Sequence, residues 1–223
     1  ATYHKLNDTQ LIEKVATALS EEKAIGWMQG RMEFGPRSLG GRSIIADPRS
    51  LRMQKQLNLK IKYRESFRPF APSVLKEHVA EWFDHDADSP YMLLVADVKS
   101  NKRLEISEEE KKLFGIAKLN VSRSSVPAIT HVDFSARIQT VHKDTNPRYH
   151  DVISRFYEKT GCPIVVNTSF NVRGEPIVCS PEDAFKCFMG TELDILAVGN
   201  YLLFKEEQKE SLKENYEERY ELD

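Results

Sequence analysis

Short apolar runs alternate with amphipathic helical patterns along almost the whole chain, and this alternation constrains the fold more than any other feature. No internal repeat, Gly/Ser linker or change of composition interrupts it, so 223 residues are expected to share one core. Strands are predicted at 24–28, 44–46, 71–75, 91–98, 138–142, 163–167, 195–198 and 201–204, with helices at 8–23, 50–59, 76–83, 107–110, 147–159 and 181–188. The sequence therefore predicts a single mixed α/β domain over residues 1–205.

Several helix ends carry their own signals. Asp8 and Thr9 are N-cap candidates for the first helix, and Asn146 precedes a proline at the first helical position of the helix that Gly161 ends. The charged segment 206–223 has few apolar anchors and is interpreted as a solvated helix or a frayed tail.

Charge and composition exclude several classes of function. The formal net charge is -2, so any anion site must be a local concentration of cations, and nucleic acid is an improbable partner. No apolar run is long enough to span a membrane and no secretory signal is present, which favours a cytoplasmic protein. The first residues resemble a chain cut at a domain boundary.

The cysteines indicate a reduced compartment. Cys162, Cys179 and Cys187 are odd in number and lack the CxxC spacing, so the sequence predicts neither a disulfide framework nor a zinc site. We expect all three to be small buried side chains and not nucleophiles.

Polar residues crowd beside the predicted strands in three segments, where a packed core would require apolar ones. EFGPRSLGGRS contains Arg37 and Arg42, and KIKYRESFRPF contains four cations. In VNTSFNVRGEP the strand 164–166 continues directly into Asn167, Thr168, Ser169 and Asn171. Ligands of α/β sheets bind at strand ends, so these segments are candidates for one site. Each alone has a structural alternative: a plain glycine turn, a solvated basic face, or side chains bonded to their own backbone.

A fourth segment, ITHVDFSARIQTV, brings His131, Asp133 and Arg137 before another strand. His131 and Asp133 are two residues apart and would share a face of a strand. A carboxylate that orients the imidazole, or a structural histidine, is preferred over a metal centre because no third ligand is close in sequence. Arginine forks, lysine and amides together suit a nucleotide plus a small carbonyl compound.

Taken in order, the motifs GRMEFGPRSLGGRSIIADPR, KYRESFRPFAPSVL, SPYML, ITHVDFSARIQTV and NTSFNVRGEPIVCSPEDAF resemble the C-terminal domain of the NodU/CmcH-type O-carbamoyltransferases. The resemblance covers about residues 25–203 and implies a YrdC-like twisted mixed sheet with flanking helices around a nucleotide cavity. It implies that carbamoyl phosphate and ATP, with Mg²⁺ on the triphosphate, form carbamoyl-adenylate, with no protein-bound metal in this domain. A separate N-terminal domain, actin/Hsp70-like and metal-binding, would then carbamoylate a hydroxyl; nothing in this chain resembles it.

The resemblance also assigns roles to particular residues. Lys62, Arg68 and Ser169 are expected to be catalytic, and Arg37, Arg137, Asn167 and Asn171 are expected to bind the substrate or nucleotide. Lys62, the arginine after it and the pair Ser169/Asn171 also resemble the signature of YrdC-like enzymes, and Ser169 with Asn171 suits the planar carbamoyl group. No covalent nucleophile is required.

Two positions depart from the family pattern: Gly41 stands where FGPRALGNR has Asn, and Phe134-Ser135 replaces the Gly-Thr of HVDGTAR. The alternative hypotheses are a nucleic-acid-binding module with a concave basic surface, and a nucleotide-sensing module without catalysis of its own.

Overall fold

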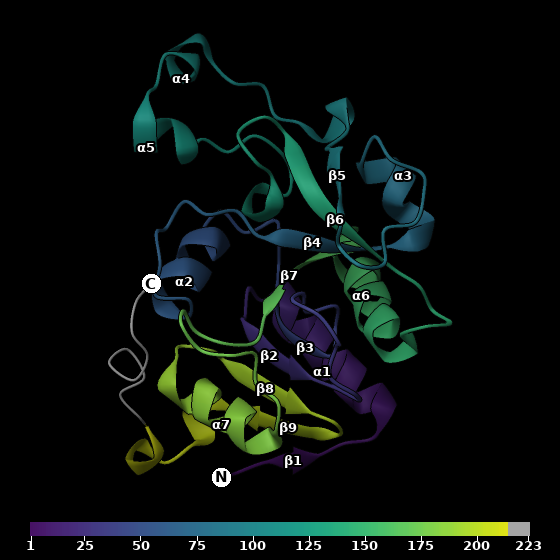
Figure 1. The fold of residues 1–223 in the computed structure, drawn as a ribbon, viewed down its shortest axis with the longest axis vertical. Helices are drawn as coiled ribbons and strands as arrows, with labels where there is room; N and C mark the ends of the chain where they lie inside the picture. Colours follow the sequence, from purple (N-terminus) through teal and green to yellow (C-terminus); the bar gives the residue numbers. More distant parts are fainter. Residues whose placement is uncertain (214–223) are drawn as a thin grey trace.

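The computed structural model describes residues 1–213. Its central element is a mixed nine-stranded sheet (Figure 1). In sheet order the strands are β1 (His4–Lys5), β9 (Tyr201–Phe204), β8 (Ile195–Val198), β2 (Ile25–Met28), β3 (Arg42–Ala46), β7 (Ile164–Ser169), β4 (Ala71–Leu75), β6 (Ser135–Val141) and β5 (Leu94–Asp97). The pairs β2–β8 and β4–β6 are parallel and the other neighbours are antiparallel. The predicted mixed α/β class is confirmed.

Seven α-helices flank this sheet in the described part of the chain, and the longer ones pack against the rest of the protein through their apolar faces. They are α1 (Asp8–Ser20), α2 (Met53–Lys60), α3 (Val79–Trp82), α4 (Glu108–Lys111), α5 (Gly115–Leu119), α6 (Pro147–Thr160) and α7 (Pro181–Gly190). In α1, Leu11, Val15 and Leu19 recur at helical spacing and are buried where α1 packs against α6. None of the helices that the structure describes is both long and apolar enough to cross a membrane.

Two of the predicted site residues, Asn167 and Ser169, lie on the central strand β7. Strand β7 runs antiparallel to both β3 and β4, with Asn167 opposite Ile45 on one side and Ala71 on the other. Ile164, Val165 and Val166 are fully buried, which anchors the strand in the core. The end of β7 is therefore a rigid support for the polar residues that it carries.

Some predicted element ends are wrong. The N-cap of α1 is Asn7, not Asp8 or Thr9, because the Asn7 side chain accepts from the N–H of Gln10 while the Gln10 side chain accepts from the N–H of Asn7. Strand β7 was expected to end at Asn167 but continues through Ser169, because its backbone stays paired with β3 as far as Ser43.

At the far edge of the sheet, β5 begins at Leu94 and not at Tyr91. Residues 205–213 form two short 3₁₀ turns, Lys205–Glu207 and Glu210–Leu212, and the rest of the predicted charged tail, 214–223, lies outside the described residues.

Candidate functional site

A small cavity of about 190 Å³ opens where the glycine-rich segment, the segment before β4, β6 and β7 meet. We call it the arginine cavity. It is lined by Pro36, Arg37, Ser38, Arg64, Pro69, Phe70, Ala71, Met92, Arg137, Asn167, Thr168 and Ser169. Three of these residues are arginines and none is acidic, so the cavity has an uncompensated positive charge. A ligand with several negative charges is the natural counterpart.

Two of the arginines approach the cavity from different elements. Arg37 lies on the exposed loop before β3, and Arg137 projects from β6 and is only partly exposed. Burial lowers the pKa of Arg137, and the positive charge of Arg37 lowers it further. An anion bound between the two guanidinium groups would relieve this repulsion.

The third arginine, Arg64, is fixed before any ligand binds. Its guanidinium lies over the ring of Phe70, with Cζ 4.9 Å from the ring centroid, and its Nε donates to Asn58 Oδ1 at 2.6 Å. Burial, and then the nearby charge of Arg68, lower the pKa of Arg64 to about 10. The group still carries its charge at neutral pH, and its remaining N–H groups are oriented by the stacking.

Three buried polar atoms in this cavity have no hydrogen-bond partner among the described residues: Ser38 Oγ, Arg137 Nε and Asn167 Oδ1. Ser38 is 4% exposed and Asn167 is 1% exposed, so bulk water does not satisfy them. An unpaired buried donor or acceptor costs about 1–3 kcal/mol, and folded proteins rarely tolerate several together. A polar ligand or an ordered water in the cavity is needed to complete them.

Lys62 lies behind the cavity wall and not in it. Its Nζ donates to the carbonyl oxygens of Ser169 (2.5 Å) and Asn171 (2.8 Å), to Asn171 Oδ1 (2.9 Å) and, at 3.3 Å, to Ser169 Oγ. Burial lowers the pKa of Lys62 to about 7. All three ammonium protons are thus occupied, and Lys62 fixes the turn after β7.

Ser169 and Asn171 are coupled to each other as well as to Lys62. Ser169 Oγ donates to Asn171 Oδ1 at 2.7 Å, and Asn171 Nδ2 donates to the Glu175 carbonyl oxygen at 2.6 Å. Only Ser169 of this pair lines the cavity. The amide of Asn171 is therefore committed within the protein in the absence of a ligand.

Arg68 lies outside the group of residues that line the arginine cavity. Its Nε lies 3.0 Å from Glu65 Oε2, and its side chain is 52% exposed. Of the two arginines in the segment KIKYRESFRPF, Arg64 is the one that lines the cavity together with Arg137. The catalytic role expected for Arg68 remains a prediction.

The glycine-rich loop is closed by a carboxylate from its own beginning. Glu33 Oε1 accepts from the backbone N–H groups of Leu39 (2.6 Å), Gly41 (2.7 Å) and Arg42 (3.4 Å). These N–H groups form the kind of anion-binding concavity that such loops make, and Glu33 fills it. The consequence is that Arg37 and Ser38 are held at the cavity wall.

The two departures from the family motif have local structural reasons. A Cβ on Gly41 would lie 2.9 Å from the Arg31 carbonyl oxygen and 3.1 Å from the Glu33 carboxylate, so this loop leaves no room for a side chain there. Phe134 has φ of 68°, which a glycine adopts more easily, and its ring lies under the Arg103 guanidinium at 4.7 Å.

His131 and Asp133 lie in the turn before β6, so they do not share the face of a strand. Asp133 Oδ1 accepts from the N–H (3.0 Å) and Oγ (2.7 Å) of Ser135, so it orients the start of β6 and not the imidazole. Burial lowers the pKa of His131. In the part of the chain that the structure describes, no group of three or more His, Cys, Asp or Glu could hold a metal ion.

Two cysteines are buried as predicted, but Cys179 is exposed. It lies immediately before Ser180, the N-cap of α7, where its N–H donates to Asp183 and its side chain has no core to enter.

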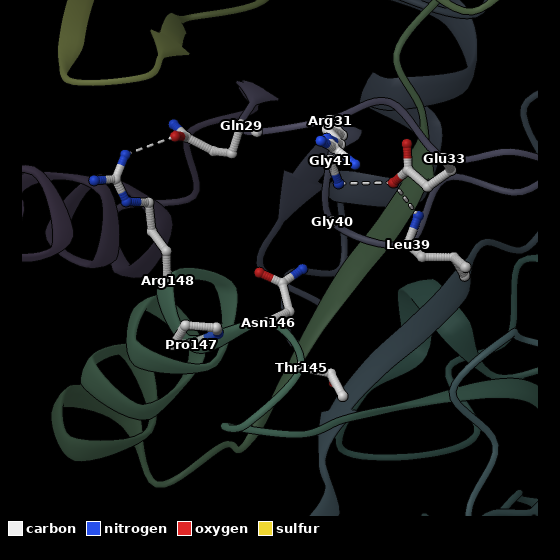
Figure 2. A pocket seen from close by; sticks show the side chains of 11 residues that line it. Gln29, Arg31, Glu33, Leu39, Gly40, Gly41, Thr145, Asn146, Pro147 and Arg148 are labelled. Atoms are coloured by element: carbon white, nitrogen blue, oxygen red, sulfur yellow. Dashed lines mark hydrogen bonds between the residues drawn. The ribbon is translucent and has the colours of Figure 1, made fainter.

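A second and larger cavity, of about 490 Å³, lies between the end of the glycine-rich loop and the start of α6 (Figure 2). We call it the helix cavity. It is lined by Gln29, Gly30, Arg31, Glu33, Leu39, Gly40, Gly41, Thr145, Asn146, Pro147 and Arg148. Figure 2 shows Glu33 bonded to the loop and Arg148 reaching Gln29 Oε1, at 2.9 Å. None of the unpartnered buried atoms among the described residues belongs to its lining.

The structure therefore brings together Arg37, Arg137, Asn167 and Ser169 of the predicted residues, with Lys62 and Asn171 directly behind them. Sequence reasoning assigned no role to Ser38 or Glu33. It counted Arg64 among the four cations of KIKYRESFRPF without assigning it a role of its own, and its Lys-x-Arg spacing from Lys62 is the signal that could have pointed to it.

Comparisons with known proteins give a consistent family. The family described as "Carbamoyltransferase C-terminus" matches residues 16–205. The chain is 58% identical to the uncharacterized protein sll1178 of Synechocystis over 100% of this chain and 36% of that protein. It is 44% identical to nodulation protein NolO of Bradyrhizobium diazoefficiens over 89% of this chain and 34% of that protein.

It is also 34% identical to the 3'-hydroxymethylcephem-O-carbamoyltransferase of Amycolatopsis lactamdurans over 74% of this chain and 28% of that protein. The chain thus spans about a third of the length of these relatives. Full-length HypF in its phosphate- and nucleotide-bound form aligns with a TM-score of 0.48 and 17% identity, over 91% of this chain and 22% of that chain. So loose a superposition does not establish a common fold.

Proposed function

Because the chain belongs to the carbamoyltransferase C-terminus family, we propose that it is the part of an O-carbamoyltransferase that binds carbamoyl phosphate and ATP and forms carbamoyl-adenylate. One observation carries this proposal: a cavity with three arginines, no acidic residue and three unpaired buried polar atoms. Its volume, 190 Å³, is below the roughly 300–1,000 Å³ typical of drug-sized ligands. It suits carbamoyl phosphate, with most of the nucleotide outside.

The arginines would reduce the electrostatic repulsion between the two substrates of this reaction. Carbamoyl phosphate and ATP are both multiply anionic, and their close approach away from water is opposed by several kcal/mol per like-charge pair. Arg37, Arg64 and Arg137 would neutralise the phosphoryl oxygens and stabilise the charge that develops in the transition state. Mg²⁺ bound to the triphosphate, as part of the substrate, would share this role.

The chemical steps need no protein nucleophile. Hydrolysis of carbamoyl phosphate by water gives carbamate and inorganic phosphate. A carbamate oxygen then attacks the α-phosphorus of ATP, a new P–O bond forms, the bond to the β-phosphate oxygen breaks, and pyrophosphate leaves. Holding the two anions in line provides most of the rate enhancement. The Lys62 ammonium, by fixing Ser169 and the turn after β7, would keep that wall of the site in place.

Transfer of the carbamoyl group is proposed for the larger protein and not for this domain alone. The chain spans about a third of its relatives, one of which is named as an O-carbamoyltransferase of a hydroxymethyl compound. We propose that an N-terminal actin/Hsp70-like domain with a histidine-held metal accepts carbamoyl-adenylate and delivers the group to a hydroxyl.

Isothermal titration of the 223-residue chain with carbamoyl phosphate, and then with ATP and Mg²⁺, tests the binding half of the proposal. Carbamoyl-phosphate-dependent release of pyrophosphate tests the chemistry. Saturable binding of both substrates together with pyrophosphate release is expected. Binding of neither substrate would refute the proposed function.

A further inference from the structure

Asn167 has an amide whose orientation is determined by its partners. Its Nδ2 donates to the Ser38 carbonyl oxygen at 2.9 Å and to Gln139 Oε1 at 2.8 Å. Gln139 is itself oriented, because its Nε2 donates to the Leu39 carbonyl oxygen at 2.9 Å and its Oε1 accepts from Ser73 Oγ at 2.5 Å. Both partners of Nδ2 are acceptors, so the amide cannot be reversed without losing both hydrogen bonds.

This network leaves Asn167 Oδ1 as a bare acceptor at the most buried residue of the arginine cavity. An acceptor is of no use to a phosphate, which offers oxygen lone pairs. The charged groups of the cavity, the guanidinium groups of Arg37, Arg64 and Arg137, are donors only. A ligand that satisfies the whole site must therefore carry both an anionic part and an N–H donor.

We propose that Asn167 Oδ1 accepts a hydrogen bond from the amino group of the carbamoyl donor and so makes the cavity selective for carbamoyl over acyl phosphates. This inference rests on the proposed function and names its specificity-determining residue. Ser38 Oγ, which belongs to the residue that Asn167 contacts, is suited to donate to the carbonyl oxygen of the same group. The role differs from the sequence-based expectation, in which Ser169 and Asn171 held the carbamoyl group, because those two are already paired with each other and with Lys62.

The physical basis is the cost of an unmade hydrogen bond. Acetyl phosphate has nearly the same shape and charge as carbamoyl phosphate but carries a methyl group where the donor has –NH₂. When it binds, Asn167 Oδ1 stays buried and unpaired, whereas a site built around a hydrogen bond discriminates strongly against an analogue that lacks it. We expect wild-type protein to bind acetyl phosphate at least 10-fold more weakly than carbamoyl phosphate.

The test measures the dissociation constants of carbamoyl phosphate, acetyl phosphate and inorganic phosphate for the 223-residue chain and for N167L and T168V. Thr168 lines the same cavity but is not one of the unpartnered residues, so T168V should keep the preference for the carbamoyl compound. N167L should bind the two acyl phosphates within about 2-fold of each other, with inorganic phosphate still bound. A merely structural asparagine would lower both affinities equally and leave their ratio unchanged.

The outcomes separate the two proposals. If wild-type protein binds acetyl and carbamoyl phosphate equally well, the role of Asn167 is refuted while the proposed function stands; this comparison needs no variant to fold. An unchanged ratio in folded N167L refutes it in the same way. If neither carbamoyl phosphate nor inorganic phosphate binds, both proposals fall.

Discussion

The arginine cavity and the helix cavity are lined by consecutive parts of one glycine-rich loop, and they differ in how far the protein has satisfied its own polar groups. The helix cavity is the larger, but three of its polar side chains are paired: Glu33 with the loop, Gln29 with Arg148, and Arg148 with Asp8. The arginine cavity is less than half that volume and keeps three arginines without an acid. Polar groups without protein partners, and not volume, distinguish a candidate ligand site from a gap between secondary-structure elements.

The largest expected effect comes from removing one guanidinium from each cavity. R137M should weaken carbamoyl phosphate binding by about 1.5–3 kcal/mol, roughly 10- to 150-fold, because charge-assisted hydrogen bonds to the phosphoryl group are lost. R31M removes an exposed arginine of the helix cavity and should change the affinity less than 2-fold. Titration calorimetry of both variants compares their affinities for carbamoyl phosphate directly. Equal losses of affinity would contradict the assignment of the ligand site to the arginine cavity.

The next prediction concerns the support behind the arginine cavity. Burial lowers the pKa of Lys62 to about 7, below its value in the unfolded chain. Between pH 7 and the unfolded pKa the unfolded state binds more protons, so this group makes the folded state more stable as the pH rises and less stable as the pH falls toward 7. From pH 7 to pH 9 its contribution should increase by about 2 kcal/mol.

Urea unfolding of wild type and K62M at pH 7 and pH 9 measures that contribution as a difference, since other titrating groups are common to both proteins. If the difference in unfolding free energy between wild type and K62M is the same at pH 7 and pH 9, the lowered pKa of Lys62 is contradicted.

The loop shared by both cavities gives a third and smaller effect. E33A removes the acceptor of the Leu39 and Gly41 N–H groups and should destabilise the fold by about 1–2 kcal/mol, whereas E33Q keeps an oxygen and should lose less. Glu110 offers a matched control, because its carboxylate accepts from the N–H of Ser107, the N-cap of α4, and neither residue lines either cavity. E110A should leave carbamoyl phosphate affinity unchanged while E33A lowers it. If E33A and wild type bind carbamoyl phosphate equally well, the glycine-rich loop does not position the residues of the arginine cavity.

The smallest effect is expected for R68A. Its half-exposed ion pair with Glu65 contributes about 0–1 kcal/mol to stability, and its side chain is not part of the cavity lining. Carbamoyl phosphate affinity should therefore change less than 3-fold. A loss comparable to that of R137M would support the catalytic role that the sequence motif predicts for Arg68.

The sequence predicts eight of the nine strands, the fold class and the four segments that meet at the arginine cavity, because apolar periodicity and motif order depend on local spacing; it misses the two-residue strand β1. It cannot rank residues within a motif. Arg64 and Arg68 are both cations of one basic segment, and only the stacking of Arg64 on Phe70 and the pairing of Arg68 with Glu65 separate them. The predicted strand at 163–167 is shorter than β7 because the last polar residues of β7 stay extended through pairing with β3. This is a contact between segments that are distant in sequence, which local patterns do not reveal.

The central claim is that the arginine cavity, and not the larger cavity beside it, binds the carbamoyl donor. A crystal structure of the 223-residue chain soaked with carbamoyl phosphate tests it most directly. We expect the phosphoryl oxygens within hydrogen-bonding distance of Arg64 and Arg137, with the amino nitrogen beside Asn167 Oδ1. Carbamoyl phosphate bound in the helix cavity against Arg31 and Arg148, with the arginine cavity unchanged, would contradict the account.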